Sequence, residues 1–266
     1  MFTTNPFSIL AETVPPIALQ SFVIVMVALV IIGTLVDIIH KKNVKYFFAN
    51  AKKAKLSATR ELGTTERAGV IIKTVVNDIA TTSELGAGKR RVAHILGMYG
   101  TILFWIASTV MIFCYTSNSS DTPNVWPIMW HVGAIMTCIG GYWFWFFLRV
   151  DVLAEAHPWY RIIKADLFVL ALLACATFGL AWSYTQSLDL NNRWDDKLFL
   201  ILFIMSNLVL FGGVYWSKFA HMFYKPGAAI QKNLAEADGS RDNLPPPADA
   251  PEQFGLGIKR EEPKHY

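Results

Sequence analysis

The stretch VAHILGMYGTILFWIASTVMIFCY, from Val92 to Tyr115, decides the fold, because it contains no Asp, Glu, Lys or Arg and is long enough to cross a bilayer. A transmembrane helix needs about 20 predominantly apolar residues. Four other stretches are similar in length and character: Ile17 to Ile39, Trp126 to Leu148, Ala165 to Tyr184 and Leu198 to His221. The sequence therefore predicts an all-α fold, an integral membrane bundle of five transmembrane helices.

The composition supports a membrane protein. Hydrophobic residues make up 53% of the chain and charged residues 17%, a balance that is unusual for a soluble domain. A β-barrel is a poor alternative, because the apolar runs are continuous rather than alternating. Cys114, Cys138 and Cys175 all fall inside the expected spans without any C-x-x-C pair. This arrangement argues against an iron–sulfur cluster held by this chain alone.

The distribution of basic residues predicts the orientation. The connection from Lys41 to Arg91 carries twelve basic residues against four acidic ones, so the positive-inside rule places it in the cytoplasm. We therefore expect a short outer N-terminus at residues 1–16 and a five-helix membrane domain at 17–224, with its cytoplasmic loop at 40–91. Residues 225–266 are polar and rich in proline, and we expect a disordered cytoplasmic tail there.

The long cytoplasmic loop is expected to contain secondary structure of its own. From Asn43 to Glu61, Ala, Lys and aromatic residues mix as in a basic helix on a membrane surface. From Thr65 to Ile79, apolar residues recur at helical spacing. Two interpretations of this basic loop stay open, namely attraction to anionic membrane lipid and docking of a cytoplasmic partner with an acidic surface. We expect no nucleic-acid partner.

Two histidines fall at the same expected depth in the bundle. His94 opens the second span and His221 closes the fifth, both at the cytoplasmic side. Two facing imidazoles are the axial ligands of a six-coordinate b-type haem. Gly97 and Gly100 would let a flat macrocycle approach the second helix, although such residues also permit ordinary close helix packing. Residues that could pair with haem propionates, or with an acidic partner, are Arg90, Arg91, Lys218 and Lys225.

The other polar groups suggest no second haem. His131 lies near the opposite end of the bundle, and no other histidine shares its depth.

His40, at the cytoplasmic end of the first span, could hydrogen-bond a quinone or a lipid headgroup. Three further residues, Arg149, Asp151 and Asp166, lie at the inner ends of the third and fourth spans. They could carry quinone protons or form a simple interfacial ion pair.

Three segments carry a family resemblance: RRVAHILGMYG at Arg90 to Gly100, KADLFVLALLACATFGLAW at Lys164 to Trp182, and YWSKFAHMFYKP at Tyr215 to Pro226. Over roughly Val92 to Pro226 the chain resembles the prokaryotic five-helix cytochrome b family. That family includes the nitrate reductase gamma subunit, heterodisulfide reductase membrane subunits and the membrane subunit of the quinone-interacting oxidoreductase of sulfate reducers. The long basic loop and the chain length look most like the membrane anchor associated with adenylylsulfate reductase.

The resemblance implies His94 and His221 as ligands of one inner haem. Where the family has ligands for an outer haem, this chain has Phe104 and Phe203. It implies an electron-transfer anchor in the prokaryotic cytoplasmic membrane, with the N-terminus outside and the C-terminus inside. Such a subunit would dock an adenylylsulfate reductase-like enzyme on the loop Lys41 to Arg91 and link it to quinone. A haem-free structural anchor and a small-solute transporter are the alternatives, and whether the subunit itself reacts with quinone stays open.

Overall fold

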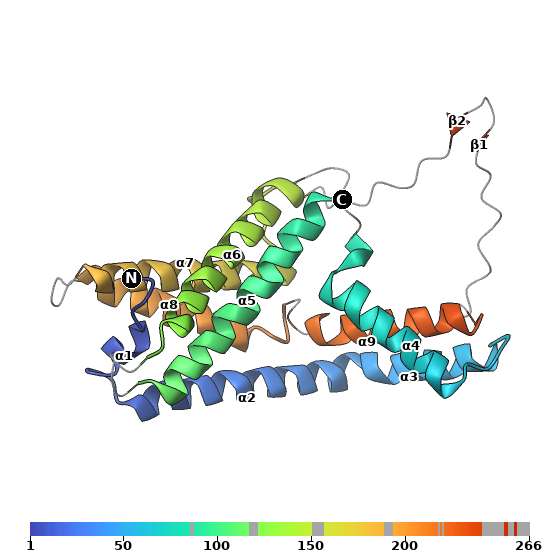
Figure 1. Ribbon diagram of the computed structural model, residues 1–266, viewed down its shortest axis with the longest axis horizontal. Coiled ribbons are helices and arrows are strands. Elements are labelled where there is room, and N and C mark those ends of the chain that lie inside the picture. Colours follow the sequence, from blue (N-terminus) through green and yellow to red (C-terminus); the bar gives the residue numbers. More distant parts are fainter. Residues whose placement is uncertain are drawn as a thin grey trace. The chain divides into compact units, whose positions relative to one another are not determined.

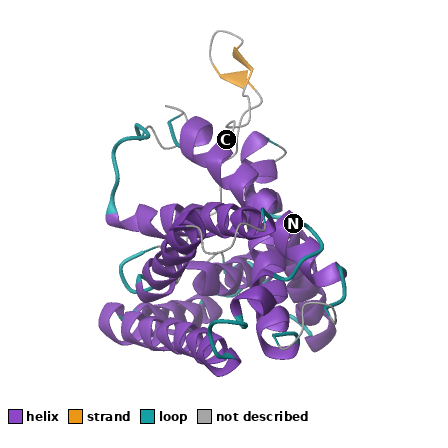
Figure 2. Ribbon diagram, turned by 90° about the vertical axis from the view of Figure 1, so that its left-hand side faces the viewer, coloured by secondary structure: helices purple, strands orange, loops and turns teal. Residues whose placement is uncertain are grey.

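The structure is a computed structural model that describes residues 1–85, 88–116, 122–150, 157–188, 194–217, 219, 221–240, 253–254 and 258–259 (Figure 1). The chain divides into two compact units. Residues 1–37 and 92–220 form the first unit, and residues 38–91 and 221–266 form the second. Helices account for most of the described chain (Figure 2). The all-α prediction is therefore confirmed.

The first unit is a helical bundle preceded by a short N-terminal helix. Its elements are α1 (Pro6–Leu10), most of α2 (Pro16–Lys41), most of α5 (Lys89–Cys114), α6 (Val125–Trp143) with the π-helical turn η4 (Phe144–Leu148), the 3-10 turn η5 (Lys164–Asp166), α7 (Leu167–Ser187) and α8 (Trp194–Gly212). Helix α7 packs between α6 and α8. The chain therefore builds a bundle in which helices adjacent in sequence are also neighbours in space.

The second unit joins two segments that lie far apart in the sequence. Its first segment contains α3 (Asn43–Leu56), α4 (Thr64–Thr74), the π-helical turn η1 (Val75–Ala80) and the 3-10 turn η2 (Ser83–Leu85). Its second segment contains α9 (His221–Ala237) and two short antiparallel strands, β1 (Gln253–Phe254) and β2 (Ile258–Lys259). Helix α9 packs against both α3 and α4. The basic loop is thus a folded unit completed by the segment after α8.

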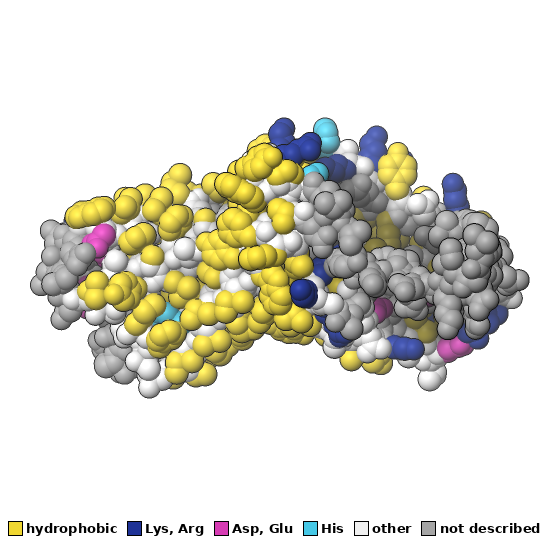
Figure 3. Space-filling view, turned by 90° about the horizontal axis from the view of Figure 1, so that it is seen from above, with side chains coloured by type: hydrophobic (Ala, Val, Ile, Leu, Met, Phe, Trp, Pro, Cys, Tyr) yellow, Lys and Arg dark blue, Asp and Glu magenta, His cyan; other side chains and the backbone are white. Residues whose placement is uncertain are grey.

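Four of the described helical segments are long and apolar enough to cross a membrane: α2, α5, α6 with η4, and η5 with α7. Helix α2 shows why a non-aqueous environment is required, because its large apolar side chains, such as Ile24, Ile32 and Ile39, are exposed. Hydrophobic side chains cover much of the surface shown in Figure 3. The chain is therefore a multi-pass membrane protein. Helix α8 carries Asp195, Asp196 and Lys197 in its first turn, and the fifth span stays a prediction.

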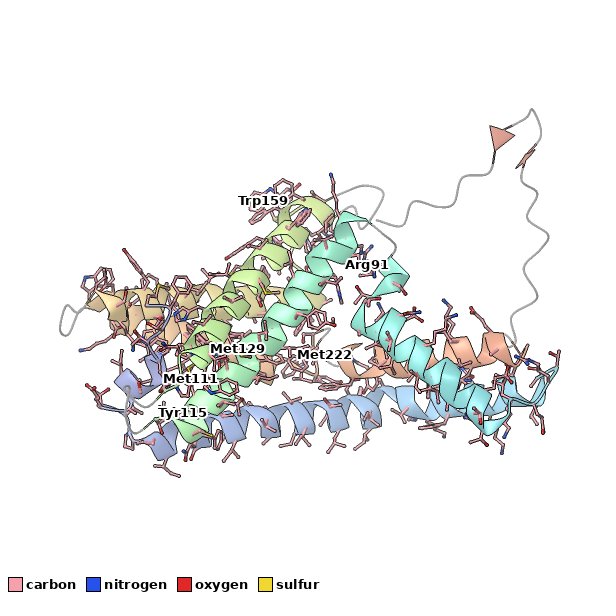
Figure 4. The ribbon with its side chains drawn as sticks, viewed as in Figure 1. Arg91, Met111, Tyr115, Met129, Trp159 and Met222 are labelled. Atoms are coloured by element: carbon pink, nitrogen blue, oxygen red, sulfur yellow. The ribbon has the colours of Figure 1, made fainter. Side chains whose placement is uncertain are left out.

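Helices α5 and α6 approach each other backbone to backbone. A Cβ atom on Gly100 would lie 2.6 Å from the backbone nitrogen of Thr137, and one on Gly133 would lie 2.6 Å from that of Phe104. Two helical turns from Gly133 on α6, a Cβ on Gly140 would lie 2.5 Å from the carbonyl oxygen of Ala93. Small residues permit this approach in membranes, where dispersion contacts replace the hydrophobic effect between helices. Met111 of α5 and Met129 of α6 lie further along the same pair (Figure 4).

The last predicted span differs from the structure. The sequence predicted one helix from Leu198 to His221, whereas α8 ends at Gly212 and is followed by a turn in which Ser217 N–H donates to the Gly213 carbonyl at 2.9 Å. Two consecutive glycines lower helix propensity at this point. His221 instead begins α9, which runs through Pro226 to Ala237. The expectation of disorder from residue 225 onward is therefore wrong for residues 225–237.

Candidate functional site

The structure places the two predicted haem ligands in different units. His94 lies in α5, within the first unit, and its side chain is exposed. His221 is the first residue of α9, in the second unit, and its side chain lies outside the described part of the chain. The pairing of these histidines across one haem therefore stays a prediction from the sequence. It no longer follows from a shared depth on two continuous spanning helices, because the helix before His221 ends at Gly212.

The two glycines predicted near the haem have different surroundings. Gly100 is enclosed by α6, so close helix packing accounts for it. At Gly97, a Cβ atom would meet no heavy atom within 4 Å, although its own backbone nitrogen faces Gly140. A cofactor role for Gly97 and Gly100 remains a prediction.

The structure describes Arg91 and His40 but not Lys218. Arg91, at the start of α5, donates from Nε to the Thr81 carbonyl at 2.7 Å (Figure 4), a contact that ties the first turn of α5 to the end of η1. Lys218 lies outside the described residues. His40 is exposed near the end of α2. A propionate-binding role for Arg91 and Lys218, and a quinone contact for His40, stay predictions.

Arg149 and Asp166 form a buried ion pair. Arg149 Nη2 lies 2.5 Å from Asp166 Oδ2, and the exposed fractions of the two side chains are 0% and 11%. The guanidinium also donates to the carbonyls of Pro158 at 2.9 Å and Arg161 at 2.8 Å, and it lies 4.3 Å from the centre of the Trp145 ring. Asp166 accepts a second hydrogen bond from Ile163 N–H at 2.9 Å. The pair therefore fastens the segment between α6 and α7 to both helices.

This arrangement gives the ion pair a structural role, the second of the two interpretations of these residues. A buried arginine requires compensation for its lost hydration, and one carboxylate, two carbonyls and one aromatic face supply it here. The segment that it fastens exposes Trp159 (Figure 4) and, next to it, Tyr160. Such side chains are typical of a membrane interface. Asp151, the third residue predicted for a quinone or proton path, lies outside the described residues. That path stays a prediction.

Aromatic side chains fill the interior where the resemblance placed outer haem ligands in related proteins. The rings of Phe104 and Phe203 lie edge to face with centroids 6.4 Å apart. Trp130 lies 5.0 Å from Phe104, and Trp182 stacks on Phe203 at 5.7 Å. Phe7 completes this group, which we call the outer aromatic cluster, through contacts with both tryptophans. The rings occupy the space between α5 and α8.

A second aromatic group lies elsewhere in the same unit. The ring of Phe219 stacks on Trp105 at 6.1 Å and also contacts Phe168 at 5.3 Å and Phe211 at 6.0 Å. Phe219 is 1% exposed, and it lies two residues before His221 in the segment that carries the family resemblance. We call this group the Phe219 cluster. It gives Phe219 a packing role in the bundle.

Sequence reasoning missed the structure of the N-terminus. Asn5 is fully buried, caps α1, and donates from Nδ2 to the Tyr115 carbonyl at 2.9 Å and to Thr122 Oγ1 at 3.2 Å. Residues 1–16 therefore include a packed part of the first unit. The signal was present in the sequence, because asparagine followed by proline is a typical start of a helix.

The role of His131 was also undefined by the sequence. Its Nδ1 atom donates to the Pro127 carbonyl at 2.7 Å, so in the neutral ring its Nε2 atom accepts a hydrogen bond from Ser183 Oγ at 2.8 Å. The side chain is fully buried and links α6 to α7. Both ring nitrogens are engaged, which makes this histidine a packing residue of the bundle. Within the described part of the chain, His, Cys, Asp and Glu do not gather in groups of three or more suited to a metal ion.

The second unit presents an exposed surface on α4 and η1. Ile72, Val75 and Val76 are 63%, 42% and 52% exposed, and the exposed side chains of Arg67 and Lys73 lie on the same helix. We call these five residues the α4 surface. An apolar centre flanked by cations is suited to a protein partner with an acidic rim.

The chain was compared with family models, curated proteins and solved structures, and none of them matches. The resemblance to the five-helix cytochrome b family therefore rests on the sequence segments alone. What it implies about ligands and partners stays a prediction.

Proposed function

We propose that this chain is the membrane subunit of an electron-transfer complex. It anchors a cytoplasmic iron–sulfur and flavin oxidoreductase of the adenylylsulfate reductase type and connects that enzyme with the quinone pool. The observation that carries this proposal is the combination of an apolar bundle with a separately folded, basic helical unit. A bundle alone would suit many membrane proteins, whereas a folded basic unit supplies a surface on which a second protein can dock.

The proposed topology has five spans, with α8 as the fifth. Its three charged residues all lie in the first turn, and the fifteen residues from Leu198 to Gly212 contain none. Charges at a helix end can reach the membrane surface. The basic second unit lies in the cytoplasm of a prokaryotic cell by the positive-inside rule, so the N-terminus is outside and the C-terminus inside.

The docking site within this proposal is the α4 surface. Its unit is fixed internally, because Asn233 of α9 donates to Thr74 Oγ1 at 2.8 Å and to Asp78 Oδ2 at 2.7 Å. Residues 59 and 60 are tied to the other end of α9, where both backbone N–H groups donate to the Asp238 carbonyl. These contacts hold the exposed side of α4 in one arrangement. A preformed surface loses less conformational entropy when a partner binds.

The proposal includes at most one haem, near the cytoplasmic side of the membrane. A bound b-type haem would supply one-electron transfer between the partner's iron–sulfur centres and quinone. His94 is exposed and so accessible to such a group, whereas the outer aromatic cluster fills the corresponding outer position. The observed contacts of Phe104 and Phe203 therefore favour at most one haem, and they equally support the second candidate function, a haem-free membrane anchor.

Copurification tests the anchoring function. The full chain is produced with the candidate oxidoreductase, and the flavin and iron that remain in washed membranes are measured. We expect Arg67→Gln with Lys73→Gln, and separately Ile72→Ser with Val76→Ser, to reduce the retained enzyme several-fold. The matched control is Lys52→Gln with Lys53→Gln, which removes the same charge from α3. Full retention in both α4 variants would refute the α4 surface as the docking site, and absence of any flavoenzyme with the unmodified chain would refute the anchor.

A further inference from the structure

We infer that α3 is a binding site for anionic phospholipid. In this arrangement the exposed side of α3 lies on the cytoplasmic leaflet and holds acidic headgroups, while the α4 surface is left for a protein. The inference goes beyond the anchoring role. It rests on the proposed topology, in which α2 crosses the membrane and ends at the cytoplasmic leaflet, and it does not depend on an oxidoreductase partner.

The first observation is that all charged side chains of α3 are positive. Helix α3 carries Lys45, Lys52, Lys53 and Lys55 and contains no Asp or Glu. All four lysine side chains are exposed. The nearest acidic residues along the chain are Asp37 before the helix, which is buried, and Glu61 after it. Glu66, further along, is paired with Arg60 at 2.7 Å. The exposed side of α3 is therefore a concentrated cationic surface, and such a surface is attracted to an anionic leaflet.

The second observation is the exposure of large apolar side chains beside these lysines. Tyr46, Phe48 and Leu56 are 61%, 65% and 83% exposed. The opposite side of the same helix is turned inward, and Ala54 is only 1% exposed. A purely water-facing helix would not require two aromatic rings and a leucine among its exposed residues. Lysines next to Tyr, Phe and Leu are typical of helices that lie in the interface, with apolar groups between headgroups and ammonium groups at the phosphates.

The third observation is the position of α3 along the chain. Helix α2 ends at Lys41 and α3 begins at Asn43, so a single residue separates a spanning helix from this surface. That residue, Lys42, has a φ of 54°, in the left-handed region, which a regular helix does not contain. Its N–H still donates to the Ile38 carbonyl, and its carbonyl still accepts from Tyr46 N–H, both at 3.1 Å. With 14 residues, α3 is about 21 Å long at the usual helical rise. Covalent attachment thus keeps the start of α3 beside the headgroups at the end of α2 and keeps Lys52, Lys53 and Lys55 within about 21 Å of them.

These observations favour lipid over an acidic protein as the occupant of α3. A protein partner could bind any exposed part of the second unit, whereas the chain itself attaches α3 directly to the spanning helix α2. The resulting high local concentration of headgroups means that even weak individual contacts are occupied together. Lys41 and Lys42 extend the same cationic region toward the end of α2.

Hydrogen exchange of the full chain in lipid nanodiscs tests the site. One sample contains phosphatidylcholine alone, and the other contains a mixture with phosphatidylglycerol. We expect the backbone amides of residues 44–56 to exchange several-fold more slowly in the phosphatidylglycerol sample. Lys52→Gln with Lys53→Gln should remove most of this difference, and Lys52→Arg with Lys53→Arg should restore it. Glutamine and arginine both have helix propensities close to that of lysine, so the helix itself should persist.

The matched control is Arg67→Gln with Lys73→Gln, which removes two charges from α4 and should leave the lipid-dependent protection of α3 unchanged. Equal exchange of α3 in the two lipid compositions would overturn the inference. Protection that appears only when a soluble oxidoreductase is added would also overturn it, because α3 would then face a protein. Failure of the α4 variants to release an enzyme would refute the proposed docking site and leave this lipid site standing.

Discussion

The rings of Phe104 in α5 and Phe203 in α8 lie edge to face inside the first unit, with their centroids 6.4 Å apart. Each is nearly buried, with exposed fractions of 1% and 8%. Tryptophans from α6 and α7 pack against them, so these two phenylalanines connect all four helices α5 to α8. The outer aromatic cluster is therefore the packing centre of the bundle.

Phe104→Ala should destabilise the bundle. Removing a buried phenyl ring leaves a cavity and typically lowers the free energy of unfolding by roughly 3 to 5 kcal/mol. The matched control is Phe113→Ala on the same helix, because that side chain is 42% exposed and faces away from the cluster. Thermal unfolding in detergent, followed by tryptophan fluorescence, measures both variants. Equal melting temperatures for the two would show that the cluster contributes little.

Gly100→Val should separate α5 from α6. Its Cβ atom would lie 2.6 Å from a backbone nitrogen of α6, and a backbone cannot move aside as a flexible side chain can. Gly97→Val is the control, since a Cβ there meets nothing within 4 Å. Both variants carry the same change in helix propensity. We expect only Gly100→Val to lower the melting temperature and the yield of folded protein, and a similar loss for Gly97→Val would contradict the packing explanation.

The sequence predicted the membrane helices well and the polar ends poorly. The span expected from Val92 to Tyr115 corresponds to α5, Lys89–Cys114. Hydropathy predicts such a helix directly, because a segment that crosses lipid has to be a continuous apolar helix. Hydropathy failed after Gly212, where Val214 and Trp216 continue the apolar pattern although the helix has ended. The backbone preference of Gly212 and Gly213 outweighed hydropathy there. As a consequence, the candidate ligand His221 lies in the second unit and not at the end of the predicted span.

Asp166→Asn should loosen the segment between α6 and α7. The substitution leaves the buried guanidinium of Arg149 without its charged partner, and breaking such a pair typically costs about 3 to 5 kcal/mol. The same segment contains Arg161 and Lys164, which are trypsin sites. We expect faster tryptic cleavage there in Asp166→Asn than in the unmodified chain. An unchanged cleavage rate would mean that the carbonyl contacts of Arg149 suffice, and Asp195→Asn serves as a control away from this pair.

The contact between η1 and α9 should weaken in acid. Asp78 accepts a hydrogen bond from Ser83 Oγ at 2.6 Å, and this bond, supported by Asn233 and by nearby lysines, holds the pKa of the carboxyl below its usual value. A pKa lowered in the folded state means that stability is present above the ordinary pKa of 3.8 and is lost as pH falls through the lower, folded value. Protease susceptibility of the second unit should therefore rise on acidification. Asp78→Asn should flatten this dependence, whereas Glu61→Gln on the exposed connection should preserve it.

The optical spectrum of the purified chain decides between the two forms of the proposed anchor. An inner haem predicts a b-type reduced-minus-oxidised spectrum that is lost in both His94→Ala and His221→Ala, because each imidazole would fill one axial position of the iron. His131→Ala is the control, since that ring is buried and bonded to Pro127 and Ser183 in the bundle. Loss of the spectrum in His131→Ala alone would contradict the ligand assignment. A chain that contains no haem and still retains a flavoenzyme on membranes would identify the haem-free anchor.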